Sequence, residues 1–211
     1  MEVFVDDTPV NADSFREGTV EDALRHVQAN RCAPGHLVVG LRLDGKDVPT
    51  HAMTDTLRRP ASSFDRLEVF TGRKAILVAD AMAHASACLT ETESACQRAA
   101  ELLTEGKIVE ASEGLADCLR TWQQIHDAIG KSIEMLQLDV EQTTVNEEPL
   151  LALIRKPAEV LLEVKDALKS RDHVLLADIL QYEFTEVTSC WHSIIAKLRA
   201  EAEDVEASGG P

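Results

Sequence analysis

The seven histidines and five cysteines are the side chains in this 211-residue chain with the most distinctive chemistry. A helical metal site typically spaces histidines and carboxylates by one turn, as in HExxH, and the sequence lacks that pattern. It also lacks the paired Glu-x-x-His motifs of a di-iron helix bundle. Asp80 and His84, four residues apart, offer a shared ligand position or, more commonly, a surface ion pair. His126 and His192 each follow a large apolar residue and are interpreted as half-buried. We therefore predict no metal site and no cofactor.

Nucleophilic catalysis needs a cysteine or serine beside an activating histidine. Cys190 and His192 are two residues apart, about 200° around a helix, and so point away from each other. Cys88, Cys96 and Cys118 fall on or near apolar positions and are interpreted as small core residues. The sequence contains no glycine-rich phosphate loop. The chain is therefore predicted to be non-enzymatic, with an active site assembled from distant residues as the alternative.

Composition excludes several classes of partner and compartment. The net charge of −16 argues against DNA or RNA and against an anionic membrane surface, because both are bound through clustered Lys and Arg. The odd number of cysteines, without CxxC spacing, favours reduced thiols over a disulfide framework. The N-terminus has no signal-peptide pattern, and no apolar run reaches the length of a spanning helix. We expect a cytoplasmic protein.

Charge and periodicity both change near Thr71–Lys74. Residues 1–73 hold 9 Lys and Arg against 12 Asp and Glu, whereas residues 74–211 hold 12 against 25. Before this point the apolar residues follow strand and turn patterns, and after it they follow helical spacing. We predict a domain over residues 1–73, a helical domain over 74–200 and a disordered acidic tail over 201–211.

The first domain alternates strand, turn and helix signals. Thr19 is expected to cap a helix, with Asp22 completing an approximate capping box. Asp44-Gly45 is a typical tight hairpin turn. The pattern predicts a helix through Val27 and strands at residues 1–5, near Val10, and at 37–43, 46–48 and 66–71.

Four stretches, MEVFV, GTVEDALRHV, LRLDGKDVP and RLEVF, resemble the ubiquitin-like β-grasp family. The resemblance implies an α+β fold. It does not imply a conjugated modifier, since the chain runs on past Gly72 into helices instead of ending in a free diglycine. Phe4 and Phe70 should project from the outer face of adjacent strands with Arg42 nearby. They are either covered by the helical domain or form an exposed docking patch.

The second domain is predicted to be an all-α, up-down four-helix bundle. The first helix spans Lys74–Thr104 with a seam of small residues, and the second repeats apolar residues every seven positions from Ile108 to Leu136. A polar, loop-like break at residues 141–148 precedes a third helix that contains Pro157. The fourth begins after an Asp172 N-cap and continues to Leu198. Short connections make consecutive helices antiparallel neighbours.

The fourth helix has two apolar faces when its residues are spaced 100° apart. The first is a wide core stripe through Leu180 and Trp191. The second lies on the flank and back, where a surface helix should be polar. It is predicted to bind a partner through Leu175, Ile179, Tyr182 and Glu186, with Asp178 at the rim. Glu183 lies beside the core stripe and either pairs with a Lys or Arg across the bundle or anchors a partner.

The stretch ALKSRDHVLLADILQYEFTEVTSCW resembles the flagellar export chaperones, whose bundles hold helices of an export substrate. The resemblance implies a non-enzymatic protein-binding module that acts as an adaptor or chaperone. Two alternatives stand beside it. One is an enzyme or metal-binding bundle whose site is not visible in the sequence. The other is a structural protein that forms a homodimer through the same stripe.

Overall fold

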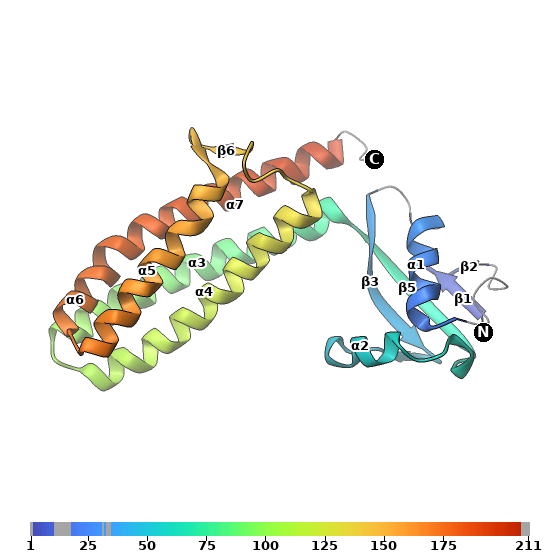
Figure 1. Ribbon diagram of the computed structural model, residues 1–211, viewed down its shortest axis with the longest axis horizontal. Helices are drawn as coiled ribbons and strands as arrows, with labels where there is room; N and C mark the ends of the chain where they lie inside the picture. The colour runs from blue at the N-terminus through green and yellow to red at the C-terminus, as the bar shows by residue number, and fades with distance from the viewer. Residues whose placement is uncertain (1, 11–17, 31, 33–34, 208–211) are drawn as a thin grey trace. The chain divides into compact units, whose positions relative to one another are not determined.

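The computed structural model describes residues 2–10, 18–30, 32 and 35–207 (Figure 1). The chain divides into two compact units, one within residues 1–77 and the other formed by Val78–Ala207. The first is a mixed sheet with helices and the second is mostly helical, so the coarse α+β prediction is confirmed.

The N-terminal unit is built on a five-stranded sheet in the order β2-β1-β5-β3-β4. Its central pair, β1 and β5, is parallel, while the other neighbours are antiparallel. All the predicted strands are present, and the strand expected near Val10 pairs with β1 as a hairpin. The strands are β1 (Glu2–Val5), β2 (Thr8–Val10), β3 (His36–Leu43), β4 (Lys46–Asp47) and β5 (Arg66–Arg73).

Two α-helices, α1 (Val20–Asn30) and α2 (Thr50–Leu57), and a short 3₁₀ turn, η1 (Ala61–Ser63), complete this unit. The predicted capping box is confirmed. The Asp22 amide donates to the Thr19 hydroxyl over 3.2 Å, and the Thr19 amide donates to the Asp22 carboxylate over 2.9 Å. Helix α1 packs on one sheet face through a core that includes Val3, Val5, Ala23, Val27, Leu41, Leu43, Leu67 and Val69. Helix α2 was not predicted.

The tight turn between β3 and β4 holds the start of β5. Asp44 and Gly45 both have positive φ angles, of 49° and 76°, as expected for the predicted hairpin turn. The Asp44 carboxylate accepts hydrogen bonds from the amides of Asp65 (2.9 Å) and Arg66 (2.8 Å). A turn residue thus also fixes where the last strand begins.

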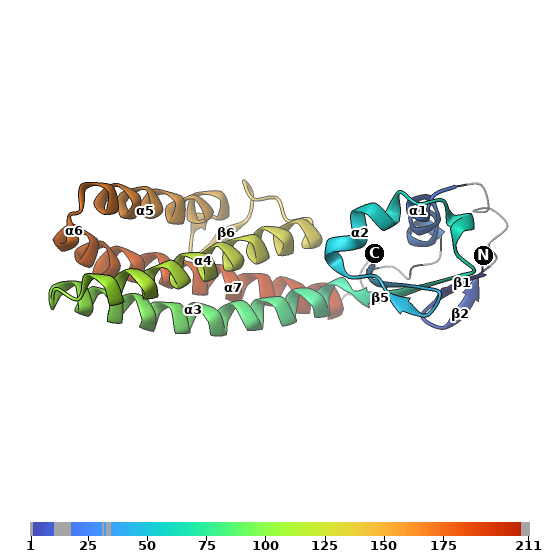
Figure 2. The same cartoon turned by 90° about the horizontal axis from the view of Figure 1, so that it is seen from below.

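In the helical unit, α3 and α4 have the predicted bounds, and α5 continues through the buried Pro157. In both views the long helices lie lengthwise beside one another (Figures 1 and 2). The prediction of a loop at residues 141–148 is wrong in part. A short hairpin forms there, with positive φ angles at Asn146 and Glu147. The elements are α3 (Lys74–Thr104), α4 (Ile108–Leu136), β6 (Thr144–Val145), β7 (Glu148–Pro149), α5 (Leu150–Ser170), α6 (His173–Asp178) and α7 (Phe184–Ala207).

The buried seam of α3 differs from the predicted one. The larger residues face the interior: Val78, Met82, Leu89, Cys96 and Leu103 are all buried. Of the predicted small-residue seam, Ala85 and Ala99 are buried as expected. The other members are only half-buried: Leu77, Ala81, Cys88, Ala95 and Leu102. Burying a long aliphatic side chain removes more apolar area from water than burying alanine, and this favours the observed seam.

Helix α7 continues as far as Ala207, so the disordered tail expected from residue 201 is wrong for 201–207. Ala202 is buried, and Lys197 pairs with Glu201 over 2.6 Å one turn away. Residues 208–211 lie outside the described part of the chain. Among the described residues, no helix is long and apolar enough to cross a bilayer.

Candidate functional site

The last helical run is interrupted by one turn of π-helix, which we call the π turn (η2, Ile179–Glu183). The predicted N-cap is confirmed, because the Asp172 carboxylate accepts a hydrogen bond from the Leu175 amide over 2.9 Å. Helix α6 ends at Asp178, and the Phe184 amide then donates to the Ile179 carbonyl, five residues back. A π turn adds one residue per turn relative to α-helix and is often found at functional positions.

The π turn separates residues that α-helical spacing placed on one outer face. Leu175 and Tyr182 are 45% and 63% exposed, and Asp178 and Glu186 are exposed as well. Ile179, however, is only 1% exposed and belongs to the core. The prediction that Ile179 lies on a binding surface is therefore wrong. The step from Leu175 to Ile179 is still α-helical, since the Ile179 amide donates to the Leu175 carbonyl, and it turns Ile179 into the core. The 100° step fails only after Ile179, where the five-residue hydrogen bond changes the position of Tyr182 relative to it.

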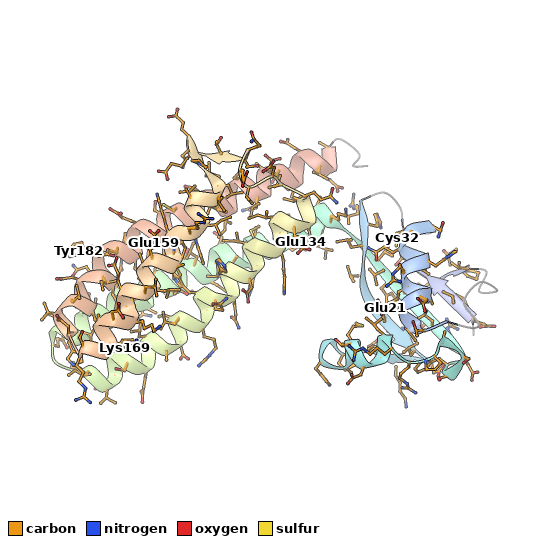
Figure 3. All side chains as sticks on the ribbon, in the orientation of Figure 1. Glu21, Cys32, Glu134, Glu159, Lys169 and Tyr182 are labelled. Atoms are coloured by element: carbon orange, nitrogen blue, oxygen red, sulfur yellow. The ribbon has the colours of Figure 1, made fainter. Side chains whose placement is uncertain are left out.

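A groove of about 660 Å³ lies between the C-terminal half of α3 and the π turn. We call it the π-turn groove. Tyr182, labelled in Figure 3, is exposed and lines this groove. The wall from α3 spans two helical turns and includes small side chains, so the groove is open to an elongated ligand. Its lining residues are Gln97, Ala100, Glu101, Thr104, Glu105, Gln181, Tyr182 and Thr185.

The two formally charged residues in this lining, Glu101 and Glu105, are both acidic. Glu105 is paired with the exposed Lys107 over 2.7 Å. The remaining polar groups, from Gln97 and Gln181 among others, both donate and accept hydrogen bonds. The groove therefore combines an aromatic ring, methyl groups, amides and negative charge.

Glu183 turns to the other side of the π turn. Partial burial raises the pKa of its carboxyl, and a hydrogen bond with Glu163 on α5 raises it further. Glu183 thus contacts the carboxyl of Glu163 on the neighbouring helix. The sequence had suggested a Lys or Arg as its partner across the bundle. Further along the same interface, Lys156 donates to Glu148 over 2.8 Å, and its Nζ lies 4.0 Å from the Cys190 sulfur.

The outer sheet face of the N-terminal unit carries the predicted aromatic pair, already in contact with arginines. The Arg42 guanidinium lies 5.1 Å from the ring centroid of Phe70, and that of Arg66 lies 4.1 Å from that of Phe4. Glu68 stands between them, 2.6 Å from Arg66 and 3.7 Å from Arg42. These contacts occupy the two ring faces with cations.

Several large apolar side chains are exposed at one end of the helical unit, where α3 joins α4 and α5 joins α6 (Figures 1 and 2). Val109 and Val174 are the most exposed, at 73% and 75%. The others are Ile108, Leu168 and Leu175. The first of these apolar residues along the chain, Ile108, comes three residues after Glu105, the last residue that lines the π-turn groove from this side. The groove therefore ends next to the apolar end of the helical unit.

The sequence missed the α3 side of the groove, because Gln97, Glu101 and Glu105 look like an ordinary solvated helix face. The residues that face them lie far along the chain, and no local pattern joins the two. The prediction that His126 is half-buried is wrong: it is exposed, with its ring centroid 6.0 Å from that of Trp191, whereas His192 is half-buried as predicted. Within the described ranges, no three His, Cys, Asp or Glu side chains are placed to hold a metal ion.

Two family models match the chain. The model described as "TP0873 N-terminal domain" matches residues 1–73, and the model described as "Domain of unknown function (DUF8042)" matches residues 80–194. No curated protein and no solved structure matches it. The second model covers more than half of the chain and includes both walls of the π-turn groove. The chain therefore belongs to the DUF8042 family, a family of domains of unknown function.

Proposed function

We propose that this protein is a non-enzymatic, cytoplasmic adaptor or chaperone-like protein whose helical unit holds a helix of a partner protein. The π-turn groove is the observation that carries this proposal. It lies at a π turn, a feature often associated with function, and Tyr182 stands beside it with 63% of its surface exposed. Tyrosine at such a position offers a large apolar ring and a hydroxyl, and it is frequent at binding sites.

The proposed occupant is an amphipathic helix with basic residues along one flank. A helix fits because the α3 wall from Gln97 to Glu105 spans about two turns at 1.5 Å per residue. Basic residues fit because both formally charged lining residues, Glu101 and Glu105, are acidic, and residues 74–211 hold 25 Asp and Glu against 12 Lys and Arg. The same excess of negative charge opposes a second copy of this chain.

The proposed architecture suits this function. We assign the helical unit to the up-down four-helix bundles, a class that includes the flagellar export chaperones, and the helix order and lengths support the assignment. We assign the N-terminal unit to the ubiquitin-like β-grasp folds. Its mixed sheet, in which the first and last strands run parallel at the centre, supports that assignment. The β-grasp unit is proposed as a second protein contact through Phe4, Arg42 and Phe70.

Site-specific photo-crosslinking tests the groove. A photoreactive residue is placed at Tyr182 and, as a matched control, at Leu162, which is 58% exposed on α5 outside the groove. A partner crosslinked from position 182 and not from position 162 supports the proposal if its crosslinked peptide is a basic amphipathic helix. Equal crosslinking from both positions would contradict a specific groove. Crosslinks only to a second copy would favour the homodimer.

Charge reversal then tests the chemistry of recognition. Glu101→Lys with Glu105→Lys should weaken binding of the crosslinked peptide by about tenfold or more, because the attraction of Glu101 becomes a repulsion and the change at Glu105 also leaves the Lys107 cation unpaired. Binding by the wild type should also weaken as salt rises. Retained affinity in the double variant would overturn the basic-helix assignment even if the groove itself binds.

A further inference from the structure

A second recess lies on another part of α3, away from the π-turn groove. It has a volume of about 60 Å³ and is lined by side chains of α3 and α4. Most of its wall is formed by small or apolar side chains, and Thr121 and Gln124 add polar groups. The lining residues are Ala81, His84, Ala85, Cys88, Thr121, Gln124, Ile125 and Ala128. This volume has room for a molecule of a few heavy atoms.

Cys88 and His84 face this recess together. They are one helical turn apart, and the His84 Nε2 atom lies 3.6 Å from the Cys88 sulfur. His84 is exposed and Cys88 is half-buried, so the pair is open to solvent on one side and supported by the helix on the other. A neutral imidazole with its proton on Nδ1 can accept the thiol proton at Nε2, and this produces a thiolate beside an imidazolium.

The other cysteines have different surroundings. Cys96 and Cys118 are buried, at 1% and 3% exposure, within the α3–α4 contact. Cys32 is half-buried, and burial together with the negative charge of Asp6 raises its pKa. Cys190 lies beside the Lys156 ammonium group and does not line this recess. Cys88 is thus the cysteine that combines a neighbouring histidine base with a recess for a reactant.

We propose that Cys88 is a modification site, oxidised by a small hydroperoxide that enters the recess while His84 acts as the base. The His84 imidazole takes the thiol proton, and the thiolate attacks one peroxide oxygen. The S–O bond forms as the O–O bond breaks, and the departing hydroxide takes the proton from the imidazolium to leave as water. Sulfur is oxidised by two electrons to sulfenic acid, and the peroxide is reduced. Hydrogen peroxide matches the size of the recess, and Thr121 and Gln124 offer it hydrogen bonds.

The test uses the full-length protein, reduced and treated with a metal chelator. After exposure to hydrogen peroxide near neutral pH, sulfenic acid is trapped with dimedone, and each cysteine is quantified by peptide mass spectrometry. Cys88 should be labelled about tenfold faster than Cys32, the internal reference. In His84→Gln this advantage should be lost, whereas His51→Gln, which changes an exposed histidine on α2, should leave it intact.

The rate of alkylation provides a second readout of the base. With iodoacetamide near neutral pH, Cys88 should be alkylated faster in the wild type than in His84→Gln, because glutamine cannot take the thiol proton. The unfolding midpoint should be the same in both proteins. The proposal fails if Cys88 is labelled no faster than Cys32, or if His84→Gln remains equally fast. It also fails if Cys88 is alkylated rapidly but gains no dimedone after peroxide treatment.

Discussion

The indole rings of Trp122 and Trp191 are stacked, with their centroids 4.5 Å apart and their planes inclined by 23°. Phe184, the first residue after the π turn, adds its ring at 4.6 Å from Trp122. All three side chains are buried. This aromatic cluster ties α4 to the start of α7 and holds the π turn from the core side.

Two substitutions at Trp122 measure how much the packing of its ring stabilises the fold. Its indole N–H is buried and has no acceptor within the part of the chain that the structure describes. Trp122→Ala should lower the free energy of unfolding by about 3–5 kcal/mol. Trp122→Phe should cost clearly less, because phenylalanine keeps an aromatic ring against Phe184 and Trp191, while both variants lose the unpaired donor. Chemical denaturation followed by circular dichroism measures both. Equal losses would show that the ring contacts of residue 122 do not stabilise the fold.

Substitutions on the last helical run distinguish its exposed residues from its buried one. Tyr182→Glu and Leu175→Glu should each change the free energy of unfolding by no more than about 0.5 kcal/mol, because both side chains already meet water. Ile179→Glu should cost more than about 3 kcal/mol, since it places an unpaired carboxylate in the core. Thermal and urea unfolding provide the measurement. A tolerated Ile179→Glu would mean that the residue is exposed in solution.

Glu183 should make the protein less stable as pH rises. Its pKa is raised in the folded state, so folding favours the protonated carboxyl, and stability is lost when that proton leaves. Glu183→Gln should therefore raise the free energy of unfolding near about pH 7, and the gain should shrink towards about pH 4, where the carboxyl is protonated in both states. Glu159→Gln, at an exposed carboxyl on α5, is the control. An unchanged pH profile in Glu183→Gln would contradict the contact with Glu163.

Two glycines inside α4 offer a route to higher stability. Gly114 and Gly130 are exposed, and a Cβ atom added at either would meet nothing within 4 Å. Gly114→Ala and Gly130→Ala should each raise the free energy of unfolding by about 0.5–1 kcal/mol, because alanine has less backbone entropy to lose. Gly106→Ala is the contrasting variant and should destabilise, since its φ of 79° suits glycine. A loss of stability in Gly114→Ala would contradict the open space around this glycine.

The helical unit shows which features a sequence can predict. The seven-residue repeat predicted α4 correctly, because its three central members, Leu115, Trp122 and Ile129, are buried on one face. The Asp172 cap likewise marked the start of α6. Both signals are local and lie within one element. The small-residue seam on α3 was a weaker signal, since larger residues on the adjoining line compete for burial.

The π turn and the groove have no comparable local signal. An α-helical and a π-helical path through Ile179–Glu183 use the same residue types, and the choice depends on how Phe184 and Trp191 fit the rings around them. The groove needs α3 and the π turn to meet, and this depends on the packing of the whole unit. The outer sheet face was easier to predict, because strand alternation alone separates Phe4 and Phe70 from the buried Val69.

The π turn also bears on how this helix can change over evolution. Ile179–Glu183 contains one residue more than an α-helix needs for the same turn. Deleting one residue there would restore α-helical geometry while leaving the aromatic residues of α7 in register with their neighbours. A deletion further along α7 would instead rotate every later side chain by about 100°. Relatives that gain or lose a single residue in this run should therefore do so at the π turn, where the length of the helix can vary without a change of core.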